Sequence, residues 1–177
     1  MKRGIINFIL AFFSFVFQCT VCKAIALGGV GPDLPLILTV SIGFMRGRKE
    51  GMLIGLLCGL FRDILYGNGL LGLYALIFVY IGYFAGIFNK LFFAKDLKFP
   101  VFLIGLSDLS YGFILYVLTF LLRRRLDFTY YLLHIILPET VYTSILGIAV
   151  YGLLMKLEKK LENDRDKAIK IQESEES

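Results

Sequence analysis

Charged and titratable side chains inside long apolar stretches are the residues of this sequence that could carry chemistry. On insertion scales, an ionisable group at the centre of a membrane helix costs about 2.5–3.5 kcal/mol. Each such group is therefore a candidate functional residue. The candidates are Lys23, Arg62, Asp63, Asp108, His134 and Glu139.

Two acids, Asp108 and Glu139, lie in separate apolar segments and could form the paired acids of a proton relay. Relays in transporters usually contain more than two such groups, so the pair alone does not establish one. Glu139 follows Pro138, which removes a backbone hydrogen bond and is expected to kink its helix. The carboxylate could instead bind water or a basic group at that kink. His134 has no second ligand near it and is interpreted as a packing residue.

Arg62 and Asp63 are adjacent in sequence and precede a glycine-rich turn, Gly67–Gly69. Neighbours on a helix point about 100° apart, so the two cannot share one partner. We predict that Asp63 faces inward, and that Arg62 reaches the outer surface or a carbonyl of the turn. Asp63 could be a polar lock or partner site, or a carboxylate at the N-terminus of the next helix.

The sequence contains no P-loop, nucleophile elbow, zinc-protease or dinucleotide-binding motif. Cys19 and Cys22 have the spacing of a redox or metal pair, but they lie in an apolar segment without a second pair. They and Cys58 are interpreted as small packing residues. We therefore predict a protein that is not an enzyme, with no catalytic residues, cofactor or metal site and no reason to bind nucleic acid.

The elements that position these residues are predicted to be membrane helices. Hydrophobic residues make up 58% of the 177, and the mean hydropathy is +0.75. Apolar runs approach the roughly 20 residues that a spanning helix needs. The predicted fold class is an all-α polytopic membrane protein with about six transmembrane helices in one bundle, residues 1–155, followed by a charged cytoplasmic tail, residues 156–177. The spans are expected at about 5–22, 34–45, 51–66, 69–88, 99–122 and 128–155.

The distribution of basic residues predicts the orientation. With both termini cytoplasmic, cytoplasmic segments hold fourteen of the nineteen Lys and Arg residues, as the positive-inside rule favours. Arg123–Arg125 would then lie on the outer side, against the rule, where they could contact head groups or an acidic partner. The tail, with six basic and seven acidic side chains, is interpreted as a solvated extension of the last helix, with a short coiled coil as the alternative.

Glycines recur every four residues in the second and third spans, and Gly82 and Gly86 repeat this spacing in the fourth. Small residues at this interval let helix backbones approach closely in lipid. The pattern indicates tight packing within the bundle or a flat face for another helix. If the protein acts by binding a partner helix, we expect a glycine face on one of these helices to dock it, with Gly82 and Gly86 as the residues to test.

The order of these features resembles the MreD family of bacterial rod shape-determining membrane proteins. The second span opens with GPDLP, and the following stretch reads GMLIGLLCGLFRDILYGNGLLGLYALIFVYIGYFAG. Asp63 takes the place of the family's Asp, and Pro138 that of a proline in the last helix. The matching glycines are Gly67, Gly72, Gly82 and Gly86. Arg62 departs from the pattern, where an apolar residue is usual.

The resemblance, over about residues 4–160, implies a non-enzymatic scaffold of the cell-elongation complex in the bacterial cytoplasmic membrane. Such a protein is expected to bind MreC and, through it, to couple MreB filaments to RodA and a class B penicillin-binding protein. The family is thought to be similar in fold to the substrate-binding subunits of energy-coupling-factor transporters. That similarity supplies the alternative function, a substrate-binding subunit of a vitamin-type membrane transporter.

Overall fold

The computed structural model describes residues 2–22, 31–66, 72–89, 98–123 and 132–175. Every element assigned in these residues is a helix, which confirms the all-α class. Lys23, Gly67 and Arg124–Arg125 lie outside the described residues. The helices are α1 (Lys2–Phe17), a π-helical turn η1 (Gln18–Cys22), α3 (Leu34–Arg46), α4 (Arg48–Tyr66), α5 (Leu73–Phe88), α6 (Lys98–Arg123), a second π-helical turn η2 (Leu132–Ile136) and α8 (Leu137–Glu175).

The helices differ in whether they are long enough to cross a membrane. Two described segments, Phe99–Leu118 and Leu132–Lys160, have the length and composition of spanning helices. Apolar but shorter segments are Ile6–Thr20, Leu34–Arg46 and Leu73–Phe88. At 1.5 Å per residue the 13 residues of α3 extend about 20 Å, against about 30 Å of hydrocarbon. One end of α3 must therefore lie inside the bundle, so its backbone groups need partners there.

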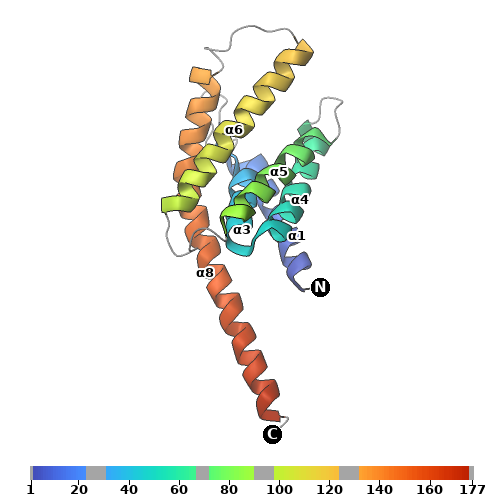
Figure 1. The fold of residues 1–177 in the computed structure, drawn as a ribbon, viewed down its shortest axis with the longest axis vertical. Helices are drawn as coiled ribbons and strands as arrows, with labels where there is room; N and C mark the ends of the chain where they lie inside the picture. Colours follow the sequence, from blue (N-terminus) through green and yellow to red (C-terminus); the bar gives the residue numbers. More distant parts are fainter. Residues whose placement is uncertain (1, 23–30, 67–71, 90–97, 124–131, 176–177) are drawn as a thin grey trace.

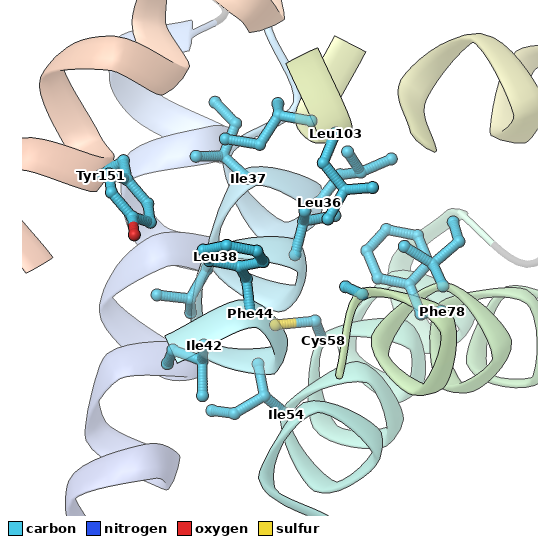
Figure 2. Close-up of a cluster of buried hydrophobic side chains, with 14 of the residues drawn as sticks. Leu36, Ile37, Leu38, Ile42, Phe44, Ile54, Cys58, Phe78, Leu103 and Tyr151 are labelled. Carbon is cyan, nitrogen blue, oxygen red and sulfur yellow. The ribbon is translucent and has the colours of Figure 1, made fainter. Parts of the chain in front are cut away.

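The short helix α3 is the centre of the bundle (Figure 1). It packs against α1, α4, α5, α6 and α8, and its residues from Pro35 to Phe44 are buried. Its apolar side chains form a core with residues of all five neighbours. Figure 2 shows that core, with Leu36, Ile37, Leu38, Ile42, Phe44, Ile54, Cys58, Phe78, Leu103 and Tyr151 labelled. Cys58 is thus a small packing residue, as its apolar surroundings in the sequence indicated.

The glycines of the four-residue pattern let α4 and α5 pack closely against each other. A Cβ added to Gly51 would lie 2.5 Å from the carbonyl oxygen of Gly82, and one added to Gly86 would overlap the backbone of Arg48. Backbones at this distance tolerate no side chain, which is why small residues recur here. The prediction that Gly82 and Gly86 dock a partner helix is wrong, because α4 already covers them.

The last helix continues well past the bundle. α8 runs from Leu137 to Glu175, and Figure 1 shows its C-terminal part projecting away from the other helices. The tail is thus an extension of the last helix. The same figure places both ends of the chain toward the same end of the molecule.

Candidate functional site

Three carboxylates that are far apart in sequence meet inside the bundle. One oxygen from each of Asp33, Asp108 and Glu139 lies within 4.8 Å of the others. We call these three residues the acidic cluster. Asp33 precedes α3, Asp108 lies in α6 and Glu139 lies in the first turn of α8, so the cluster joins three helices. Asp33 and Asp108 are only 1% and 2% exposed.

Asp33 is positioned by the start of α3. Its carboxylate accepts a hydrogen bond from the N–H of Leu36 at 3.2 Å, which makes it the helix N-cap. Its own N–H donates to Thr143 Oγ1 of α8 at 3.2 Å, and the N–H of Leu34 donates to Gln18 Oε1 at 2.9 Å. Side chains thus satisfy a helix end that starts within the apolar interior, where no water would do so.

Arg62 of α4 points into the bundle and forms an ion pair with Asp33. Its guanidinium carbon lies 5.1 Å from the ring centre of Tyr111, 5.6 Å from that of Tyr74 and 5.9 Å from that of Phe78. Three aromatic faces and a carboxylate together replace most of its hydration. The prediction that Arg62 reaches the outer surface is therefore wrong. An internal carboxylate offers a stronger partner than the surface.

Asp108 and Glu139, which the sequence analysis paired as candidate relay acids, do come together. The structure adds Asp33 as a third acid and Arg62 as a nearby cation. Glu139 is placed by the break in the last helix, where the π-helical turn η2 ends directly before Leu137 and Pro138. Proline cannot donate to the preceding turn, so the change of helix type at this point has a local cause.

Asp63, next to Arg62, has a separate role. Its two carboxylate oxygens accept hydrogen bonds from the N–H groups of Tyr74 at 3.1 Å and Ala75 at 2.9 Å. These are first-turn donors of α5, whose N-cap Gly72 has a positive φ of 100° and offers no side chain. Asp63 therefore supplies from α4 the cap that α5 lacks, as expected for a carboxylate at the N-terminus of the next helix.

A second polar group lies at the other end of α3. Arg46 pairs with Glu158 of α8 at 2.6 Å and donates to Asn7 Oδ1 of α1 at 2.7 Å. Asn7 in turn donates to Glu50 at the start of α4. This network brings the N-terminal helix, the connector between α3 and α4, and the start of the tail to one end of the bundle.

An apolar groove with a volume of about 280 Å³ opens beside this network. Residues of α1, α3 and α8 line it, and Arg46, Glu158 and Lys160 supply its charged part. The apolar lining residues are Ile6, Ile9, Leu10, Ile42, Met45, Leu154 and Leu157. One wall continues into the exposed aromatic face of α1, where Phe13 is 59% exposed.

Sequence reasoning missed several residues of these sites, among them Asp33, Tyr111 and Glu158. Asp33 was noted only as part of a helix start, yet an acid before an apolar helix is an N-cap signal. An arginine inside the bundle also requires an anion, and that requirement could have identified Asp33 as its partner. Tyr111 and Glu158 carry no such signal, because their partners lie on other helices.

The chemistry available at the acidic cluster is that of carboxylates, a guanidinium and a phenol. Such groups hold protons or cations and join helices. The described residues of the site therefore support a structural or binding role.

Comparison with known proteins identifies the family. The family described as "MreD: rod shape-determining protein MreD" matches residues 1–161, which is most of the chain and includes every residue of both polar sites. No curated protein and no solved structure gives a match. The chain therefore belongs to the MreD family of rod shape-determining membrane proteins.

Proposed function

We propose that this protein is a non-enzymatic scaffold of the cell-elongation complex. It would bind the membrane helix of MreC and so help couple MreB filaments to RodA, a class B penicillin-binding protein and peptidoglycan synthesis. The observation that carries the proposal is the family match over residues 1–161, which extends through all of the helices that form the bundle. Members of this family act in rod-shape determination.

The internal contacts suit a scaffold. The polar contacts of Arg62 and Asp63 each tie α4 to another element, and Arg46 ties α3 to α1 and α8. Such cross-links fix the relative positions of helices, because breaking one leaves an unpaired polar group in an apolar interior. A frame held in this way presents a constant outer surface to a partner.

We place the protein in the bacterial inner membrane as a multi-pass protein with both termini cytoplasmic. The contact of Arg46 with Asn7 and Glu158 supports a common side for the N-terminus, the basic connector and the tail. Labelling of an Asp127→Cys variant in intact cells tests this orientation. A membrane-impermeant thiol reagent should label it from outside, and labelling only from the cytoplasmic side would refute the topology. The variant is made in a protein whose native cysteines are replaced by Ser or Ala, so that only the introduced thiol can react.

We place the MreC helix in the groove between α1 and α8. The groove is apolar, open and bounded by an exposed aromatic face, which suits a helix seated in lipid. A photo-crosslinking residue at Ile9, which lines the groove, should capture MreC in cells. The same residue at Leu76, which is 59% exposed on α5, is the matched control. Capture from Leu76 and none from Ile9 would place the partner against α5 and reject the groove.

A further inference from the structure

The acidic cluster has the dimensions of a site for one cation. Calcium binds oxygen ligands at 2.3–2.6 Å, so two ligands on opposite sides of it are about 4.6–5.2 Å apart. The oxygens of Asp33, Asp108 and Glu139 lie within 4.8 Å of one another. The spacing therefore leaves room for one divalent cation and is compatible with calcium.

The charges of the site favour a divalent ion. Ionised, the three carboxylates contribute three negative charges, and Arg62 offsets one of them through its pair with Asp33. Neither ion pair found among the described residues includes Asp108 or Glu139. Two negative charges would remain in an apolar interior, which is strongly unfavourable. A divalent cation neutralises both, whereas a monovalent ion leaves one uncompensated.

Among the described residues, a second unpartnered polar group, besides those of the carboxylates, lies on α6. The hydroxyl of Tyr111 and Oδ1 of Asp108 are fully buried and have no hydrogen-bond partner in the part of the chain that the structure describes. The two residues lie three apart on one helix and so share a face. The ring of Tyr111 lies 5.1 Å from the guanidinium carbon of Arg62, which is paired with Asp33, so Tyr111 lies beside the cluster. Buried polar atoms nearly always have partners, and a bound ion would supply one to each.

We propose that the acidic cluster binds one divalent cation, for which calcium is the probe, with carboxylate oxygens of Asp33, Asp108 and Glu139 and the hydroxyl of Tyr111 as protein ligands. The ion joins the start of α3 to α6 and α8, while Arg62 stays paired with Asp33. The site is independent of partner binding, and it concerns the interior of the bundle rather than its outer groove.

The first test is calcium binding by the full-length protein purified in detergent and stripped of metal with EGTA. Isothermal titration with calcium at constant ionic strength should show one site per chain. Asp108→Asn and Glu139→Gln keep the side-chain shapes and should each weaken binding at least tenfold. Glu158→Gln removes a paired acid at the other end of the bundle and should leave binding unchanged. Equal binding by all four proteins would assign the calcium to other acids and overturn the proposal.

A second readout does not depend on the stability of the acid variants. Terbium occupies calcium sites and emits when a nearby aromatic ring is excited, and the chain has no Trp. Emission from the wild-type protein should rise with terbium, fall on addition of calcium, and be largely lost in Tyr111→Phe. Tyr80→Phe is the control, because Tyr80 is 57% exposed on α5. The proposal fails if Tyr111→Phe emits like the wild type. It also fails if the wild type shows no terbium or calcium response at any pH, since protons would then balance the cluster.

Discussion

Replacing Arg62 with Met should destabilise the bundle substantially. Met fills much of the same space between the aromatic rings but leaves Asp33, which is 1% exposed, without its cation. Removing one partner of a buried ion pair costs about 3–5 kcal/mol. Because the Arg62 side chain is 21% exposed, we expect the lower end of that range, about 3 kcal/mol. That is roughly a 150-fold change in the unfolding equilibrium constant.

The companion change Asp33→Asn separates charge from helix capping. Asn keeps an oxygen that can accept the N–H of Leu36, so the start of α3 is retained. The double variant Arg62→Met, Asp33→Asn should therefore recover about 2 kcal/mol of the loss, a coupling typical of residues in contact. The control Arg48→Met removes an exposed arginine that stacks on Tyr83 and should cost about 1 kcal/mol or less.

The assay is reversible unfolding by SDS titrated into detergent micelles containing EGTA, followed by near-UV circular dichroism of the tyrosines. The reasoning is refuted if Arg62→Met lies within about 1 kcal/mol of the wild type. It is also refuted if the double variant is no more stable than the single one, because the two losses would then be independent.

Two further predictions use the same assay. Gly55→Ala should destabilise the protein by about 1–3 kcal/mol, because the added methyl group would overlap the carbonyl of Phe78. In the control Gly152→Ala, the added methyl group has nothing within 4 Å, so this change should be neutral or stabilising. Equal effects of the two changes would contradict the close packing of α4 and α5. Asp63→Ala should destabilise the protein by about 2 kcal/mol, because two N–H groups at the start of α5 lose their acceptor. Asp63→Asn should cost less. An unchanged stability of Asp63→Ala would show that the cap contributes nothing.

The helices could be predicted from the sequence because apolar runs and charged connectors leave little choice. Residues 34–45 and 51–66 were expected to be helical, and α3 and α4 cover them. The capping role of Asp63 was also predictable as one of two alternatives, since only a short turn separates it from α5. Local sequence decides both features.

The acidic cluster could not be assembled from the sequence. Asp33, Asp108 and Glu139 are brought together by the position of α3 at the centre of the bundle, which depends on the packing of five other helices. The prediction of where the Arg62 side chain points was wrong for the same reason, because its partner lies 29 residues away at the start of another helix. Likewise, the four-residue glycine spacing indicated close packing but could not say which helix covers it.

The scaffold role is tested most directly by the partners that co-purify with the tagged protein from native membranes. The account predicts a bitopic coiled-coil protein, MreC, as the principal partner, with RodA and a penicillin-binding protein recovered through it. Recovery instead of ATPases with a large transmembrane coupling protein would contradict this role. It would identify the chain as a substrate-binding subunit of a transporter.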